Sequence, residues 1–370
     1  MEGVATNPSK GFLPQGPTAP PPSTVAEGVT VAVREPRTRT PVTGEALLRV
    51  QYRITDRDLT LLGWLADHGV LTTDQIAHAL FPSLDFAQRR LLKLTKAGLI
   101  DRFRPQRPDG GSHPYHYVLS QLGVEVMAAQ RDEDDLPRKD RARKRRWWLT
   151  NRANLPHLLA VNQFFTDLAG HARTHPDNAL ERWWPSSRCQ QPGAFTRLNG
   201  DVDVHAWSAT IAADGHGIWT DTTPDINNPD DVDADDDLYA ADDGQDLDGQ
   251  DLDGQDGASG VRVPFFVEVD LSTEDLPRLA AKVGAYQRWS RLTGHIWPVL
   301  FWLGPALRER HLHTRLAEHS TWVPVATATR DHTQAEATSP AGPVWWLHGL
   351  PSGERLTLAD LATTVTRTHT

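Results

Sequence analysis

The sequence predicts a mixed α and β fold in two parts, a winged helix-turn-helix followed by an α/β domain with a mixed sheet. Two observations lead to this prediction. Between residues 54 and 119, three short segments with helical apolar spacing precede two strand-like segments. From about residue 154 onward, strand-like and helix-like segments alternate, which is typical of an α/β domain.

The first two predicted helices contain residues that can cap them. Thr55 or Asp56 can begin a helix whose apolar side includes leucines at 61, 62 and 65. The stretch LTTDQIAHALF, residues 71–81, predicts a second short helix that Thr72 or Thr73 would cap.

The third predicted helix covers SLDFAQRRLLKLTKAG, residues 83–98, and Gly98 ends it. Its apolar side includes Leu91 and Leu94, and a basic stripe lies opposite. The segments LIDRFRP and HPYHYVL follow as two strands joined by the polar loop QRPDGGS. Three helices and a hairpin in this order predict a winged helix-turn-helix, in which a basic outer stripe contacts DNA.

Basic residues in three places are the candidate contacts to double-stranded DNA. We expect backbone contacts above all, because few side chains here suit a specific base code. A basic run at 138–146 holds seven Lys or Arg residues in nine and would extend the footprint. The candidates are Arg89, Arg90, Lys93 and Lys96 on the third helix, Arg102, Arg104 and Arg107 on the wing, and Arg141, Arg143, Lys144, Arg145 and Arg146 in the basic run.

Composition divides the chain further. The net charge is −10, but residues 221–256 hold fifteen Asp and no basic residue, so the remainder has 38 − 33 = +5. Such a segment is too polar to pack, and we expect it to be disordered. The predicted organisation is a Pro/Thr-rich disordered tail at 1–50, the winged helix at 51–131, a basic linker at 132–152, the α/β domain at 153–350 with the acidic insert at 221–260, and a C-terminal tail at 351–370.

Cysteine usage and hydropathy indicate a cytoplasmic protein without a membrane partner. The single cysteine, Cys189, cannot form an internal disulfide. No apolar run approaches the roughly 20 residues that span a bilayer. The N-terminus also lacks the charged and apolar regions of a signal peptide.

The segment VPFFVEVD, residues 263–270, contains the most informative pattern of the second domain. Because alternate residues of a strand share a face, Phe265, Val267 and Val269 should point to one side. Glu268 and Asp270 should then point to the other side, where they could hold a common Mg²⁺ or Mn²⁺. If they share an ion, neutralising Asp270 should stabilise the metal-free protein by relieving repulsion.

One of only six lysines, Lys282, lies in the helix predicted for TEDLPRLAAKVGAYQRWSRLT, with Ser272 or Thr273 as its cap. It could lean back toward the carboxylates, where its compact charge would polarise a water or a phosphate. A simpler arrangement stays open, in which Lys282 lies at the helix edge and Asp270 only begins a loop.

The sequence resembles the replication-relaxation family, which comprises actinobacterial proteins linked to plasmid replication and DNA relaxation. The resemblance covers residues 54 to 325 apart from the insert. It rests on RDLTLLGWLADHGVLTTDQIAHALFPS, on GLIDRFRP with PYHYVLS, on HLLAVNQFF, on ADGHGIWT and on VPFFVEVDLSTEDLPRLAAKVGAY. It implies a restriction-endonuclease-like C-terminal domain, similar to PD-(D/E)xK nucleases. In those enzymes an acid on one strand, an acid on the next and a lysine assemble around a metal.

Carried onto this chain, the resemblance implies a catalytic set of Asp214, Glu268, Asp270 and Lys282, with the three carboxylates holding Mg²⁺ or Mn²⁺. Asp270 stands where the nuclease pattern has its lysine, so Lys282 is the candidate substitute. Ala213 stands where the family tends to have proline. The implied function is replication or relaxation of plasmid or mobile-element DNA, with metal-dependent nicking as the candidate activity.

A non-enzymatic function stays open beside the nuclease. In that alternative the protein is a replication initiator or transcription regulator, and the α/β domain is a platform for dimerisation or for a partner. Replication or conjugation proteins are the partners that this function implies. The sequence does not separate the two functions, and it leaves open the DNA site and the oligomeric state.

Overall fold

The computed structural model describes residues 54–105, 111–132, 138, 140–195, 209–223 and 260–368. The predicted tail at 1–50, most of the acidic insert and the wing residue Arg107 lie outside these ranges. Among the described helices, none combines the length and the apolar character needed to cross a membrane.

The N-terminal part has three helices, α2 (Asp56–His68), α3 (Thr73–Leu80) and α4 (Leu84–Ala97). Three short strands, β1 (Leu71–Thr72), β2 (Ile100–Phe103) and β3 (His116–Leu119), form an antiparallel sheet in the order β1-β3-β2. The helices and the β2–β3 hairpin occur where the sequence predicts them, whereas β1 was not predicted. Thr55 and Thr72 both form capping boxes, and Gly98 ends α4 with a left-handed backbone at φ 80°.

Three helices connect this part to the larger sheet. They are α5 (Gln121–Gln130), α6 (Arg141–Thr150) and α7 (Leu155–Thr174). The sequence predicted a linker at 132–152, but residues 141–150 of that region form α6. This segment contains neither Pro nor Gly, and Ala142 and Leu149 are buried, so helix formation gains a packed side.

The second part contains a six-stranded sheet in the order β4-β5-β6-β7-β8-β9. β6 is parallel to β7 and β7 to β8, while the other neighbours are antiparallel, so the predicted mixed sheet is confirmed. The strands are β4 (Asn178–Pro185), β5 (Gly215–Asp221), β6 (Val261–Val269), β7 (Val299–Leu303), β8 (Val325–Thr329) and β9 (Trp346–Leu347).

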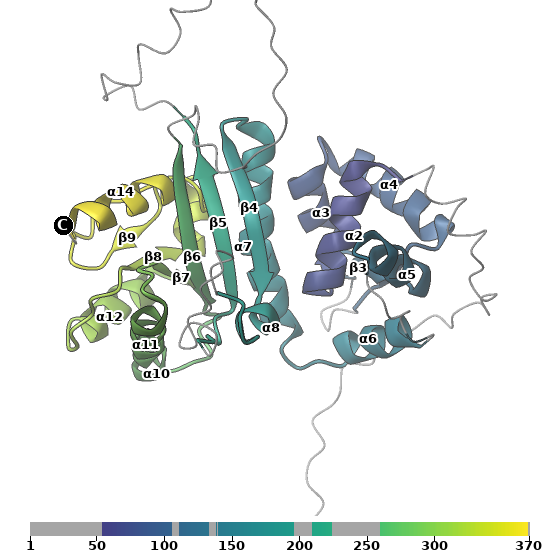
Figure 1. Cartoon of the computed structure of the whole chain (residues 1–370). Helices are drawn as coiled ribbons and strands as arrows, with labels where there is room; N and C mark the ends of the chain where they lie inside the picture. Colours follow the sequence, from purple (N-terminus) through teal and green to yellow (C-terminus); the bar gives the residue numbers. More distant parts are fainter. Residues whose placement is uncertain are drawn as a thin grey trace, which may run out of the picture.

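Helices cover both faces of this sheet (Figure 1). Side chains of α7 and α14 pack on one face, and those of α10, α11 and α12 on the other. The single helix predicted after β6 is interrupted at Lys282 and begins later than predicted, because Asp275 and not Ser272 or Thr273 caps it. The remaining helices are α8 (Ser186–Cys189), α10 (Leu276–Ala281), α11 (Val283–Thr293), α12 (Ala306–Leu316), α13 (Arg330–Ala335) and α14 (Leu358–Thr368).

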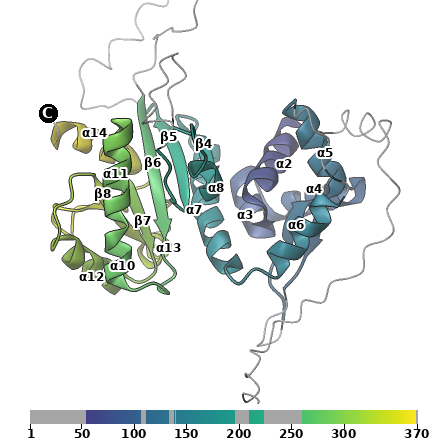
Figure 2. The ribbon, with the colours of Figure 1, turned by 60° about the horizontal axis from the view of Figure 1, so that its bottom comes forward.

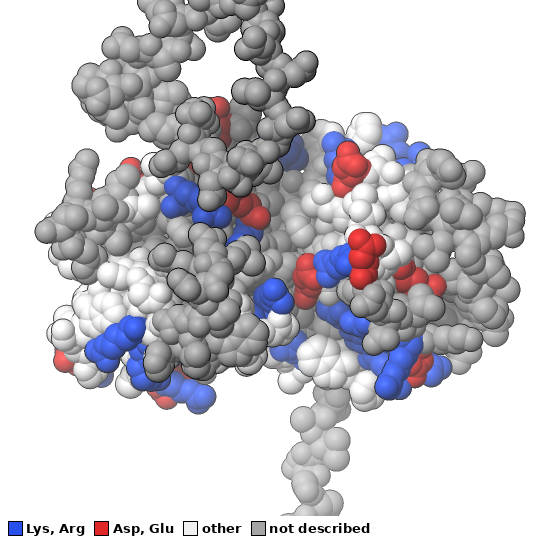
Figure 3. Space-filling model, in the orientation of Figure 1, with Lys and Arg blue, Asp and Glu red and all other residues white. Residues whose placement is uncertain are grey.

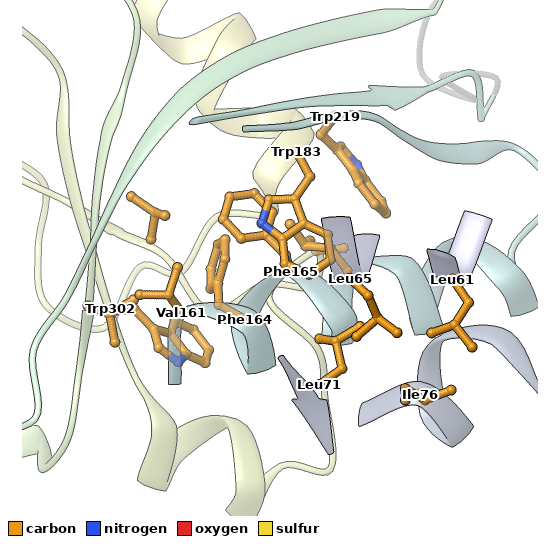
Figure 4. Packing of buried hydrophobic residues seen from close by; sticks show 14 of the residues in the cluster. Leu61, Leu65, Leu71, Ile76, Val161, Phe164, Phe165, Trp183, Trp219 and Trp302 are labelled. Carbon is orange, nitrogen blue, oxygen red and sulfur yellow. The ribbon is translucent and has the colours of Figure 1, made fainter. Parts of the chain in front are cut away.

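One apolar cluster joins the two parts of the chain. It runs from Leu61, Leu65 and Ile76 in the N-terminal helices through Phe164 and Phe165 of α7 to the sheet (Figure 4). Figure 2 shows α7 between the sheet and α2 and α3. Two hydrogen bonds fix this arrangement: a buried one from Asn162 Nδ2 to the Val70 carbonyl at 2.7 Å and a partly buried one from Gln75 Nε2 to the Leu159 carbonyl at 2.8 Å. The two predicted domains therefore share a core.

The predicted alternation along β6 is confirmed. Phe265, Val267 and Val269 belong to the cluster on the α7 side of the sheet. Phe266 belongs to a second cluster, under α10, α11 and α12. Glu268 shares the face of Phe266, so its carboxylate enters the layer between the sheet and these three helices.

Candidate functional site

Two carboxylates meet where β5 begins and β6 ends. Asp214 directly precedes β5, and Glu268 is the eighth residue of β6. The strands are antiparallel, with Gly215 opposite Val267, so Asp214 lies next to the end of β6. Asp214 Oδ2 accepts a hydrogen bond from the Val269 amide at 2.9 Å. The second strand thus holds the first carboxylate beside Glu268.

Lys282 reaches the same place from the junction between α10 and α11. Its Nζ lies 3.0 Å from Glu268 Oε2 and 2.9 Å from Glu274 Oε2. Its backbone keeps right-handed helical angles, φ −58° and ψ −32°. The side chain is about one-third exposed, whereas Glu268 is buried. Lys282 therefore faces both solvent and the buried carboxylate.

Two further side chains complete the cluster, and sequence reasoning missed both roles. The buried Tyr286 hydroxyl donates to Glu268 Oε1, and Tyr286 was not among the predicted site residues. His157 Nε2 lies 2.9 Å from Asp214 Oδ1. His157 and Asp214 are 57 residues apart, and no local spacing links them.

Burial and charge shift the protonation of this cluster. Burial, and then the nearby Asp214, raises the pKa of Glu268 to about 7. Burial opposes protonation of Lys282, but Glu268 and Glu274 outweigh it and hold its pKa above the usual value. The hydrogen bond to Asp214 raises the pKa of His157 despite partial burial. Burial and then Glu268 raise the pKa of the Tyr286 hydroxyl, which stays a donor.

Asp270 does not join the cluster, in contrast to the predicted set of three carboxylates. Its side chain pairs with Arg308 of α12, and its Oδ1 accepts from the Ser272 amide at 3.0 Å. Ser272 has a positive φ of 64°, so Asp270 stabilises a tight turn. Because a buried carboxylate needs a compensating cation, the arginine on α12 holds Asp270 in a separate ion pair.

The described residues contain no group of three or more His, Cys, Asp or Glu side chains placed to hold a metal ion. Asp214 and Glu268 are the two predicted metal ligands that the structure brings together. Their four carboxylate oxygens each receive a hydrogen bond, from His157, Val269, Tyr286 and Lys282.

The predicted basic stripe on α4 lies on the surface. Arg89, Lys93 and Lys96 are exposed, and Leu91 and Leu94 are buried behind them. Arg89 pairs with Asp85, one turn earlier on the same exposed side. These three side chains are therefore accessible to a partner.

Arg90 differs from its predicted role as a DNA contact. Its guanidinium pairs with Asp58, a buried carboxylate of α2 that also closes the capping box with Thr55. From the sequence, Arg90 was included among the candidate DNA contacts of this helix. Its contact with Asp58 instead joins α4 to α2.

The remaining candidate DNA contacts lie on the hairpin and on α6. Arg102 and Arg104 stack over the Tyr115 ring, at 4.0 and 4.3 Å from its centroid. Arg141, Arg143 and Lys144 are exposed. Arg145 and Arg146 are half-buried, and Arg146 lies 3.3 Å from Asp101. Figure 3 shows Lys and Arg side chains gathered over the position of α6.

The region that holds these residues matches the model of the replication-relaxation family, from residue 62 to residue 300. The chain belongs to this family. Membership suggests a role in plasmid replication or relaxation. The matched region of this replication-relaxation protein runs from α2 into β7 and includes α4, α6, Asp214, Glu268 and Lys282. No curated protein and no solved structure matches the chain.

Proposed function

We propose that the protein binds double-stranded DNA and nicks one strand in a metal-dependent reaction at Asp214, Glu268 and Lys282. One observation supports this proposal above the others. Asp214, which directly precedes one strand, accepts a hydrogen bond from the Val269 amide of the adjacent strand, and the neighbouring Glu268 of that strand lies 3.0 Å from Lys282. This grouping agrees with the nuclease resemblance in the sequence, with the lysine supplied by a helix.

The DNA-binding half of the proposal depends on the N-terminal part. The order of α2, α3, α4 and the β2–β3 hairpin supports a winged helix-turn-helix. The exposed stripe of Arg89, Lys93 and Lys96 on α4 would contact phosphates, and Arg102 and Arg104 would extend the contact from the hairpin. The family's link to replication also favours DNA as the partner.

The carboxylates of Asp214 and Glu268 repel each other, and a divalent cation bound between them would offset this repulsion. Burial and the negative charge of Asp214 raise the pKa of Glu268, which means that ionising Glu268 costs free energy. A cation in addition to Lys282 would reduce this cost. Asp214 and Glu268 would hold Mg²⁺ or Mn²⁺, whereas Asp270, paired with Arg308, would not. The bound ion would activate a water and stabilise the charge on the leaving oxygen.

The other side chains of the cluster would orient and balance the charges. Lys282 is held between Glu268 and Glu274 and faces solvent, so its ammonium can contact a scissile phosphate. His157 would hold Asp214 in position and, when protonated, offset its charge. Tyr286 would fix the orientation of the Glu268 carboxylate through its hydroxyl.

A second candidate function rests on the same cluster. Every carboxylate oxygen of Asp214 and Glu268 already has a donor, which is typical of a buried structural network. In that case the protein would be a replication initiator or transcription regulator, and the sheet would serve as a dimerisation or partner platform.

A nicking assay separates these functions. Supercoiled plasmid is incubated with the protein in Mn²⁺, Mg²⁺ or EDTA, and open-circular product is quantified. We expect the wild type to form open-circular product in Mn²⁺ or Mg²⁺ but not in EDTA. The nicking rate of Glu268→Gln and of Lys282→Ala should be lower by at least about 100-fold, because each substitution removes a charge from the reacting centre. Glu318→Gln, an exposed carboxylate paired with Arg315, is the matched control and should keep full activity. If the plasmid stays supercoiled in every metal, the nicking activity is refuted and the non-enzymatic function, with the sheet as a dimerisation or partner surface, is the one that remains.

A further inference from the structure

Helix α6 has one packed face and one exposed face. Ala142 and Leu149 are 7% and 2% exposed and hold the helix against the rest of the protein. On the other face, Arg143, Lys144, Trp147 and Trp148 line an open pocket of about 470 Å³. Arg143 and Trp147 are one helical turn apart, as are Lys144 and Trp148, so the four side chains form one surface. We name them the α6 platform.

The two tryptophans of the platform are unusually exposed. Trp147 is 68% and Trp148 52% exposed, and no large hydrophobic side chain in the described ranges is more exposed than Trp147. Burying such rings is among the largest single gains available to a chain, and most tryptophans therefore lie inside. Two neighbouring exposed rings indicate a surface that a partner covers.

The charge around these rings identifies the chemistry of that partner. Residues 138–152 contain eight Lys or Arg residues and one acid, Asp140, so the segment has a net charge of 8 − 1 = +7. Arg152 lies over the Trp148 ring at 4.5 Å from its centroid. Flat aromatic faces inside a strongly basic surface suit a polyanion that offers flat rings of its own.

We propose that the α6 platform binds single-stranded DNA, with unpaired bases stacked on Trp147 and Trp148 and the flanking phosphates on Arg143 and Lys144. Aromatic stacking and a basic groove together are the usual means of binding single strands. A duplex does not satisfy this surface, because its base faces are already stacked and only its phosphates are accessible. An interfacial membrane helix would need a broad apolar face, whereas the second face of α6 is packed against the protein.

The position of α6 gives the platform a use, which rests on the proposed nicking function. α7 begins at Leu155, shortly after α6 ends at Thr150, and His157 contacts Asp214. His157 is the ninth residue after Trp148, so at most about 30 Å of chain joins the α6 platform to the cluster. Figure 1 shows α6 connected directly to the start of α7. A strand unpaired near the cluster would therefore be within reach of the platform.

The test compares single-stranded and duplex DNA by fluorescence anisotropy, with a labelled oligothymidylate of about 20 nucleotides and a duplex of equal length. We expect Trp147→Ala with Trp148→Ala to weaken single-strand binding about 25-fold or more, at about 5-fold or more per lost stack. Duplex binding should change less than about twofold. Trp147→Phe with Trp148→Phe should restore most of the affinity, since phenylalanine also stacks. Leu307→Ala, 54% exposed on α12, is the control for removing an exposed apolar side chain and should bind like the wild type.

Two further arms identify which part of the DNA is bound. Wild-type protein should bind an abasic oligonucleotide of equal length and charge at least about 25-fold more weakly, a result that needs no variant to fold. Arg143→Ala with Lys144→Ala should reduce the log–log salt slope for single strands by about 1.4, at about 0.7 per phosphate.

Several results would overturn the inference. One is equal binding of abasic and normal single strands by the wild type, and another is a double alanine variant with unchanged single-strand affinity. If the wild type binds phosphatidylglycerol vesicles and the double alanine variant does not, the surface is a membrane-binding surface instead. If the wild type self-associates and the double alanine variant does not, the surface binds a second copy of the chain instead. If the wild type binds neither form of DNA, the proposed function fails as well. If duplex binding and nicking persist while the tryptophan substitutions leave single-strand affinity unchanged, only the inference about the α6 platform is refuted.

Discussion

Glu268→Gln should change how the stability of the protein depends on pH. Burial and the charge of Asp214 raise the pKa of Glu268 from the ordinary 4.5 to about 7. A carboxyl with a raised pKa binds its proton more tightly in the folded state. Its contribution to stability is therefore present below pH 4.5 and is lost as the pH rises through about 7.

The size of the effect follows from this difference in pKa. At about 1.36 kcal/mol for each pH unit between the ordinary pKa and the raised one, the whole effect is on the order of 3 kcal/mol, and most of it falls between pH 5 and pH 8. Glu268 is only 3% exposed, so solvent screening does not reduce this value much. Glutamine does not titrate, and Lys282 keeps its ion pair with Glu274 at 2.9 Å. The variant should thus lose the pH dependence without leaving an unpaired lysine.

Urea unfolding at pH 5, 6, 7 and 8 measures the difference. The unfolding free energy of the wild type minus that of Glu268→Gln should fall by roughly 2 to 3 kcal/mol over this range. Glu318→Gln, at an exposed ion pair, should run parallel to the wild type at every pH. Millimolar Mn²⁺ should stabilise the wild type and not Glu268→Gln if this carboxylate holds the ion. A free-energy difference that does not vary with pH would refute the reasoning from burial and charge.

Three further predictions follow from other parts of the structure. Replacing Arg89, Lys93 and Lys96 together with Ala should reduce the log–log salt slope of duplex binding by about two to three; an unchanged slope would move the DNA surface to another region, such as α6. Asp270→Asn should lower the free energy of unfolding in urea by about 3 kcal/mol, because it leaves Arg308 without its buried partner. The control Asp85→Asn, at the exposed pair with Arg89, should lower it by less than about 1 kcal/mol. This expectation reverses the one drawn from a shared metal position, and a stabilised Asp270→Asn variant would contradict the ion pair. Deleting residues 226–256 should change the melting temperature by no more than about 2 °C, since Asp221 and Val261 are already paired across β5 and β6 and a shorter loop is easier to close; a large decrease would mean that the insert is packed.

The sequence by itself determined the elements whose signals are local. Capping residues such as Thr55, Thr72 and Gly98 lie within a few residues of the helix ends they define, so their positions predict those ends correctly. The period of two in FFVEV separates Phe265 from Phe266 because it follows from strand geometry alone. The same geometry places Glu268 on the face opposite Phe265, the face that α10 and α11 cover in the structure.

Only the tertiary structure decided which charges meet. His157 reaches Asp214 and Arg308 reaches Asp270 because α7 and α12 pack on opposite faces of the sheet, a choice that no local pattern contains. A strand period places Glu268 and Asp270 on one face, yet it does not say which cation compensates each of them. For the same reason, the sequence did not show which side of α6 is exposed. A run of basic residues looks like a linker until two buried side chains, Ala142 and Leu149, show which side of it is packed. Helix and strand periods depend on neighbours in sequence, whereas partners for buried charges depend on long-range packing.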